Sequence, residues 1–189
     1  MKKNLIIAVM MTIVTTVLLG IIYPLVVTGI AQVIFPHKAN GQLISKDGKL
    51  IGSSIIGQPF SGPTYFHSRP SAAGTGYDAA SSGGTNLGPT NQTLIARVDT
   101  DAKALQAENP GVPVPVDLVT TSASGLDPHI SIAAAEFQVP RIAHERGMSP
   151  SQVQELVAAH TEGRQFGFLG EPRVNVLELN MALNAAAGH

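Results

Sequence analysis

The chain has 189 residues, no cysteine and a formal net charge of −1. The absence of cysteine excludes a disulfide scaffold and a thiolate metal site, and the near-zero charge without a run of Lys or Arg argues against a nucleic-acid partner. Only 13% of the residues are charged, about half the usual share, which fits a subunit whose surface is covered by neighbours.

An apolar segment opens the chain, and residues 5–35 contain no Asp, Glu, Lys, Arg or His. A helix of about 20 residues crosses the hydrocarbon core of a bilayer, so this segment predicts a single transmembrane helix. We therefore divide the chain into a transmembrane segment, residues 1–36, and one soluble domain, residues 37–189. Pro24 is expected to kink the helix or to mark its passage from a buried to an interfacial environment.

A signal peptide is the alternative for such a beginning. Its apolar region is shorter, about 7 to 15 residues, and ends at a small-x-small cleavage site. Here no cleavage pattern follows Tyr23-Pro24. A retained helix is therefore the favoured interpretation, whereas cleavage would leave a secreted protein that begins near Ala39.

Small residues recur at every fourth position in the first half of the predicted helix, at Ala8, Thr12, Thr16 and Gly20. Lipid provides little hydrophobic drive between helices, so a ridge of small residues is the usual means by which a second helix approaches closely. Such residues are common in membrane helices in any case, and a spacing of four drifts around the helix. The stripe is thus a candidate helix-docking face.

The charges that flank the apolar segment predict its orientation. Lys2 and Lys3 precede it, and only Lys38 lies close behind it. The positive-inside rule then keeps the N-terminus in the cytoplasm. The soluble domain is therefore expected to be extracytoplasmic, on the outer side of the membrane.

The soluble domain is expected to be α+β, with helices dominating its second half. Strands are predicted at 41–44 and 49–56, joined by a turn at Lys46-Asp47-Gly48, because Asp-Gly favours tight hairpin turns. Residues 57–89 are rich in Gly, Ser, Pro and aromatic residues and predict a long loop. Such a loop is uncommon in a compact domain unless it is functional or lies on a partner.

The first helix of this domain is predicted to begin after the cap Asn91 and to end at Asn109-Pro110-Gly111. Its inward face is expected to consist of Leu94, Ile95, Val98, Ala102 and Leu105. Residues 113–121 contain alternating Val and Pro and predict an edge strand at best.

Three more helices are predicted in the second half. One runs from 131 to 146, bent at Pro140 and stopped by Gly147. Capping boxes at 149–152 and 175–178 open the other two.

Catalytic and metal motifs are missing from the sequence. A phosphate-binding loop has four residues between its two glycines, whereas six residues separate the glycines within 41–49. Residues 121–125 do not match the Gly-x-Ser-x-Gly pattern of a nucleophile elbow. His144-Glu145 lacks the second histidine of a helical zinc site. We therefore predict no catalytic residue and no metal ligand.

Two segments, 122–129 and 169–175, are nevertheless richer in turn residues than a plain domain requires. Either both are turns and caps, or they contact a neighbouring subunit or a small ligand. A rival hypothesis is a stand-alone, membrane-anchored extracytoplasmic binding protein or hydrolase, which would use the loop 82–86 with His67 and Arg69 as a small-anion site.

Seven motifs, spread in order over nearly the whole chain, match one known family. They are Tyr23-Pro24-Leu25, Phe35-Pro36 with Ala39-Asn40-Gly41, Ile56-Gly57-Gln58, Tyr65-Phe66-His67-Ser68-Arg69-Pro70-Ser71, Ser82-Gly83-Gly84-Thr85-Asn86-Leu87, Ser122-Ala123-Ser124-Gly125-Leu126-Asp127 and Val174-Asn175-Val176-Leu177-Glu178-Leu179-Asn180. Together they resemble the C subunit of the bacterial Kdp potassium-transporting P-type ATPase.

The resemblance implies a non-catalytic accessory subunit, needed for the assembly and stability of a high-affinity, ATP-driven potassium uptake complex. The partners that it implies are a channel-like potassium-translocating A subunit, a P-type ATPase B subunit and a small F peptide. The chain lacks the Asp-Lys-Thr-Gly-Thr phosphorylation motif that the pump subunit requires. It is therefore not expected to hydrolyse ATP on its own.

The family's C subunit is also described as a catalytic chaperone that raises the affinity of the pump subunit for ATP. This role conflicts with the predicted topology, because ATP is cytoplasmic and the domain is expected outside. We expect no tightly bound cofactor, and ATP is implied by the family alone. The candidate residues for a subunit interface or a nucleotide are His67, Arg69, Ser122, Ser124, Gly125, Asp127 and Gln138.

Overall fold

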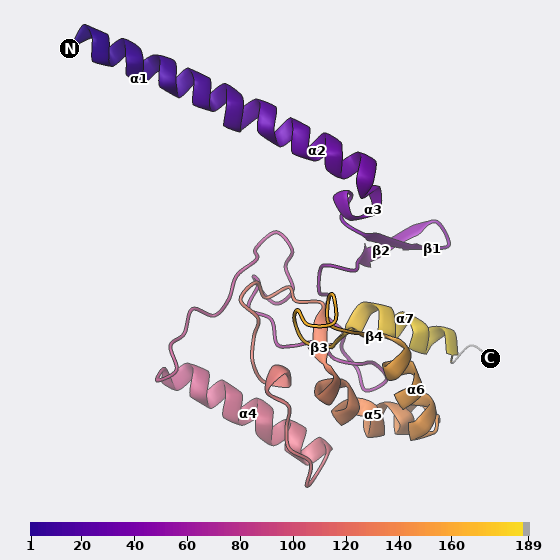
Figure 1. Cartoon of the computed structure of the whole chain (residues 1–189). Helices are drawn as coiled ribbons and strands as arrows, with labels where there is room; N and C mark the ends of the chain where they lie inside the picture. Colours follow the sequence, from indigo (N-terminus) through magenta and orange to yellow (C-terminus); the bar gives the residue numbers. More distant parts are fainter. Residues whose placement is uncertain (187–189) are drawn as a thin grey trace. The chain divides into compact units, whose positions relative to one another are not determined.

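The computed structural model describes residues 1–186 (Figure 1). They form two compact units, which divide after Ser53. The predicted mixture of helices and strands and the apolar N-terminal helix are confirmed. The β-hairpin, which the sequence assigned to the soluble domain, lies in the first unit together with the apolar helix.

The first unit begins with a continuous helix, Lys2–Ile34, which by length and composition can cross a membrane. It comprises α1 (Lys2–Thr15), the π-helical segment η1 (Thr16–Ile22) and α2 (Tyr23–Ile34). The π-helical turns lie directly before Pro24, which lacks an N–H and clashes with the turn before it. A wider helical turn therefore occurs where the sequence predicts a kink.

The first unit ends with α3 (Pro36–Ala39) and an antiparallel hairpin of β1 (Leu43–Lys46) and β2 (Lys49–Ser53). Asp47 and Gly48 between the strands have φ values of 52° and 75°. Positive φ at both central residues is the geometry of a type I′ turn, whose twist matches that of the strands. The predicted hairpin turn is confirmed.

The second unit contains a three-stranded antiparallel sheet in the order β3-β5-β4. Its strands are β3 (His129–Ser131), β4 (Thr161–Glu162) and β5 (Arg173–Asn175). Its helices are α4 (Gln92–Glu108), the 3-10 turn η2 (Val116–Leu118), α5 (Ile132–Arg146), α6 (Pro150–Ala159) and α7 (Val176–Ala186). The buried core includes Phe66, Ile130, Ile142, Val153, Val157, Val174, Leu179 and Leu183.

The helices of this unit begin at the predicted caps, and α4 and α5 also end where the sequence predicts. The Asn91 side chain accepts hydrogen bonds from two N–H groups in the first turn of α4. Ser149 and Gln152 form the reciprocal capping box of α6. Gly147 ends α5 in the left-handed conformation, with φ of 64°, and the Asn175 side chain accepts a hydrogen bond at the start of α7.

One prediction for the second unit is wrong, and another holds only in part. Residues 113–121 contain the 3-10 turn η2 instead of an edge strand, because Pro115 fixes φ at −64° and the Asp117 carboxylate binds the N–H of Ser131. The inward face predicted for α4 is half-buried: Leu94, Val98, Ala102 and Leu105 are intermediate in exposure and Leu105 packs against the core, whereas Ile95 is 46% exposed. Helices α5–α7 supply most of the core (Figure 1), and α4 is joined to α5 by an ion pair between Glu108 and Arg141 at 2.6 Å.

Candidate functional site

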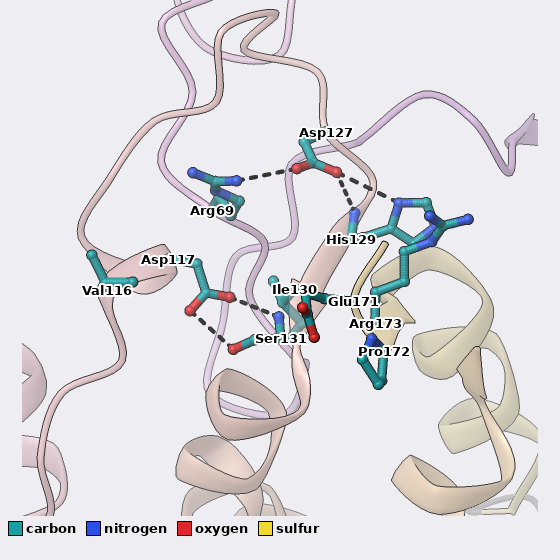
Figure 2. Close-up of a pocket in the computed structure, with 10 residues that line it drawn as sticks. All are labelled: Arg69, Val116, Asp117, Asp127, His129, Ile130, Ser131, Glu171, Pro172 and Arg173. Carbon is teal, nitrogen blue, oxygen red and sulfur yellow. Dashed lines mark hydrogen bonds and ion pairs between the residues drawn. The ribbon is translucent and has the colours of Figure 1, made fainter. Parts of the chain in front are cut away.

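Both segments that the sequence singled out, 122–129 and 169–175, contribute to one cleft of about 440 Å³ in the second unit (Figure 2). The cleft is lined by Arg69, Val116, Asp117, Asp127, His129, Ile130, Ser131, Glu171, Pro172 and Arg173. These residues come from the long loop, η2, β3 and β5 with the residues around them. Tertiary structure thus assembles the cleft from stretches that are far apart in the sequence.

Arg69 connects the long loop to the segment before β3 through hydrogen bonds. Its Nη1 donates to Asp127 Oδ2 at 3.2 Å, while Nε and Nη2 donate to the carbonyl oxygens of Thr120 and Thr121, both at 3.3 Å. The side chain is 24% exposed. A guanidinium with bonds in three directions is held in place by the fold itself, so Arg69 connects the long loop to this segment.

Asp127 uses its second carboxylate oxygen on His129. Oδ1 accepts a hydrogen bond from the His129 N–H at 3.0 Å and lies 3.5 Å from His129 Nδ1. Burial alone would raise the pKa of Asp127, but the hydrogen bonds from His129 and the charge of Arg69 outweigh it and lower the pKa below its ordinary value of 3.8. The carboxylate is therefore ionised at neutral pH.

The lowered pKa predicts a pH-dependent contribution of Asp127 to stability. A carboxyl group whose pKa is lower in the folded state stabilises the fold above its unfolded pKa, and it loses this contribution as the pH falls through its folded pKa. We expect Asp127→Asn to lower the free energy of unfolding at neutral pH, and its difference from the wild-type chain to shrink as the pH falls below about 4. Urea unfolding of both proteins over this range measures the effect.

Asp99 is the matched control, because it is exposed and pairs with Lys103 one helical turn away at 2.6 Å. An exposed pair of this kind is worth about 0.5 kcal/mol or less, so Asp99→Asn is expected to change stability little. A difference between Asp127→Asn and wild type that stays constant down to about pH 3 would contradict the predicted contribution.

The loop that contains Gly125 packs closely on residues 57–89. Gly125 is buried with φ of 67°, and a Cβ there would lie 2.7 Å from both Ala73 N and Gly83 O. The Ser124 carbonyl accepts a hydrogen bond from the Gly83 N–H at 2.9 Å. The long loop is therefore held against this segment by backbone contacts, which leave no room for a side chain at Gly125.

Gln138 and Asn180 hold the backbone of two consecutive residues of the long loop. Gln138 Oε1 accepts from the His67 N–H at 2.8 Å, and its Nε2 donates to the His67 carbonyl at 3.2 Å. Asn180 makes the same pair of bonds with Phe66, both at 2.9 Å. Both side chains are 1% exposed. Each amide thus pairs with the backbone as a neighbouring strand would.

A second cleft of about 300 Å³ includes His67, Gln138 and Arg141 in its lining. Arg141 Nη2 donates to Gln138 Oε1 at 2.8 Å, and His67 Nε2 lies 2.8 Å from the Gly62 carbonyl. Burial lowers the pKa of His67, and the hydrogen bond to Gly62 opposes that effect only in part. The Gln138 amide is fully used within the fold.

The predicted candidate residues are distributed over the two clefts and the loop that contains Gly125. Arg69 and Asp127 line the first cleft, and His67 and Gln138 line the second. Ser122 and Ser124 lie in the loop with Gly125, their hydroxyl oxygens 3.5 Å apart, and neither is among the described lining residues of the two clefts.

Several residues of these sites were not singled out individually from the sequence, among them Asp117, His129, Arg141, Arg173 and Asn180. Asn180 did leave a signal, because it is a polar residue between Leu179 and Leu183 on the buried face of α7. A buried amide there requires hydrogen-bond partners. Among residues 1–186, no group of three or more His, Asp or Glu side chains is placed to hold a metal ion.

The candidate docking stripe extends from α1 into η1, with Ala8 and Thr12 in the former and Thr16 and Gly20 in the latter. A spacing of four residues is slightly more than one turn of an α-helix but less than one turn of a π-helix. The small residues therefore shift around the helix axis in one direction along α1 and in the opposite direction within η1. A Cβ on Gly20 would lie 3.8 Å from Thr16 Cγ2, so these two positions adjoin. The Thr12 hydroxyl donates to the Ala8 carbonyl at 2.9 Å and needs no partner outside the helix.

Comparison with known proteins identifies the family. The family model of KdpC, described as the c chain of the K⁺-transporting ATPase, matches residues 5–185. The chain belongs to the KdpC family. A relative from Koribacter versatilis, the KdpC subunit of a potassium-transporting ATPase, is 71% identical over 184 residues, which cover 97% of this chain and 95% of the relative.

Two further KdpC subunits of potassium-transporting ATPases agree. The one from Caulobacter vibrioides is 61% identical, with 90% of this chain and 87% of the relative covered. The one from Methylococcus capsulatus is 56% identical, with 94% of this chain and 95% of the relative covered. The KdpC match includes both structural units, and it supports a transporter subunit and gives no support to a stand-alone enzyme or binding protein.

Proposed function

We propose that this chain is a non-catalytic accessory subunit of an ATP-driven potassium uptake complex, anchored in the membrane by the helix Lys2–Ile34. The observation behind this proposal is that the helix is long and apolar enough to cross a membrane, while none of its residues is buried in the structure. An apolar helix of this length needs lipid or other helices around it. Membership of the KdpC family indicates that the complex is a potassium-transporting ATPase.

The proposed partners are a channel-like potassium-translocating A subunit, a P-type ATPase B subunit and a small F peptide. The stripe of Ala8, Thr12, Thr16 and Gly20 docks on helices of the A subunit, because small side chains let two backbones approach. The second unit covers the potassium entrance of that subunit on the extracytoplasmic side. Its function there is to stabilise the assembled complex.

Tight binding of ATP is not part of this function. The Gln138 amide is committed to His67 and Arg141, and the Arg69 guanidinium is committed to Asp127 and to two carbonyl groups. Neither side chain is therefore free to hold a phosphate, which supports a subunit without a nucleotide of its own.

The orientation can be tested by protease accessibility. In sealed right-side-out vesicles, we expect an added protease to digest the second unit while an N-terminal tag beside Lys2 and Lys3 stays protected. The proposed location follows from the charge bias, because the two lysines remain in the cytoplasm. Protection of the second unit until detergent is added would refute this orientation.

Complex membership has its own test. The chain, purified through a tag from potassium-starved cells in mild detergent, is expected to bring the two large transporter subunits with it, as identified by mass. Recovery of the chain alone, monodisperse and without those subunits, would refute the proposed function.

A further inference from the structure

A tight turn at residues 165–169, here called the Phe turn, presents its apolar side chains to solvent. Phe166 is 86% exposed, Phe168 69% and Leu169 46%. A fully buried Phe or Leu side chain gains free energy relative to an exposed one, so side chains this open indicate a surface that is covered in the working protein.

The Phe turn is a well-formed structure. Gln165 and Leu169 pair through two backbone hydrogen bonds of 2.9 Å each, and the Phe168 N–H donates to the Gln165 carbonyl at 3.2 Å. Phe166 and Gly167 have φ values of 53° and 81°, as in a type I′ turn. Positive φ is uncommon for a bulky residue such as Phe, so the turn holds this side chain outward at a local cost.

Ion pairs lie on both sides of the Phe turn, and in each of them the two charges balance. Arg164 Nη2 lies 2.6 Å from Glu171 Oε2, and Arg173 Nη2 lies 2.9 Å from Glu162 Oε2. Each cation at the base therefore has its own carboxylate. The aromatic tip is surrounded by a charge-balanced rim.

The neutral rim favours a protein over a lipid surface as the occupant. Segments that bind the membrane surface combine apolar side chains with Lys or Arg that face anionic lipid, but Arg164 and Arg173 are each paired with a glutamate. A pocket with apolar walls and an uncharged rim complements the Phe turn.

The size of the Phe turn favours a partner that is held by other contacts as well. Its three apolar side chains expose roughly 400 Å², whereas each side of a standard stable interface buries about 800 Å². The turn cannot by itself hold a second copy of this chain. It has the size of a central aromatic anchor within a larger interface.

We infer that the Phe turn inserts into an apolar pocket with an uncharged rim on the extracytoplasmic face of the channel-like subunit. This inference rests on the proposed function, and it names the contact by which the second unit is placed over the potassium entrance. The transmembrane helix supplies the rest of the interface.

Photo-crosslinking in the assembled transporter tests the contact directly. With Phe168→p-benzoylphenylalanine in cells that express all subunits, illumination is expected to join this chain to the channel-like subunit. The same replacement at Val112, which is 40% exposed, is the control and is expected to give about tenfold less adduct. An adduct with lipid, an adduct with a second copy or no adduct at Phe168 would overturn the inference.

A double variant measures the strength of the contact. Phe166→Ser with Phe168→Ser is expected to weaken retention of this chain on a tagged channel-like subunit by about 30-fold for each aromatic anchor lost. Ile95→Ser with Val112→Ser removes two exposed apolar side chains elsewhere and is expected to leave retention unchanged. Thermal unfolding of all variants should match wild type, since the replaced side chains are exposed.

The two proposals fail in different ways. If the wild-type chain is not retained on the transporter, the proposed function fails. If the wild-type chain and the Phe166→Ser, Phe168→Ser variant are retained equally, the proposed function stands and the inference about the Phe turn fails.

Discussion

Asn180→Leu is expected to lower the free energy of unfolding of the second unit by about 4 kcal/mol, because it leaves two buried groups without partners. The N–H and the carbonyl of Phe66 both bond to the Asn180 side chain at 2.9 Å, and both side chains are buried. Leucine has a similar volume and leaves no large cavity, so the loss reports the hydrogen bonds. Thermal unfolding of the chain in mild detergent should shift down by roughly 12 °C.

Asn184 is the matched control for this prediction. It lies one turn further along α7, is exposed and accepts a hydrogen bond from Arg146 Nη2 at 2.9 Å. Asn184→Leu is expected to change the free energy of unfolding by about 0.5 kcal/mol or less. If Asn180→Leu unfolded at the wild-type temperature, the Phe66 peptide would not depend on the Asn180 amide.

Gln138 holds the backbone of His67 in the same way, so its replacement distinguishes a structural role from a role in binding nucleotide. A residue that holds nucleotide would change affinity for ATP when replaced and leave stability unchanged. Gln138 instead bonds to both polar groups of the His67 peptide, so a loss of stability of the same kind is the consequence of removing its amide.

Replacement of Thr12, Thr16 and Gly20 together by Leu is expected to release this chain from the transporter. Three large side chains on one stripe prevent close approach of a second helix, while the segment remains apolar enough to span the membrane. We expect at least about a tenfold drop in the amount retained on a tagged channel-like subunit, with potassium uptake by starved cells falling in parallel. Pull-down in mild detergent and uptake measurements check this result.

A control variant with the same number of leucines should behave as wild type. Val9→Leu, Ile13→Leu and Val17→Leu lie one position away along the same helix and keep its apolar character. Normal co-purification and uptake of the Thr12, Thr16 and Gly20 variant would show that the stripe is not an interface.

Local features of the fold could be predicted because their causes lie within a few residues. Asp47-Gly48 takes the two positive φ values of the hairpin turn. Ser149 and Gln152 cap a helix between positions three apart, and Gly147 stops the helix before it.

The strands of the second unit could not be predicted in the same way. Strands β3, β4 and β5 have only three, two and three residues, which is too short for an alternating pattern to be recognised. Residues 113–121 do contain β-branched residues, but their prolines and the bond from Asp117 to Ser131 favour a 3-10 turn. In that segment, tertiary contacts outweighed the local propensity for a β-strand.

The sequence by itself determined the apolar helix that can span a membrane, the hairpin turn and the helix caps, because each depends on neighbouring residues or on overall apolarity. It also held the motifs by which the family could be identified. Only the tertiary structure decided that Arg69 binds Asp127 and that Gln138 and Asn180 clamp the long loop. Those partners are 58, 71 and 114 positions apart, and contacts between buried groups at such separations follow from packing of the whole unit.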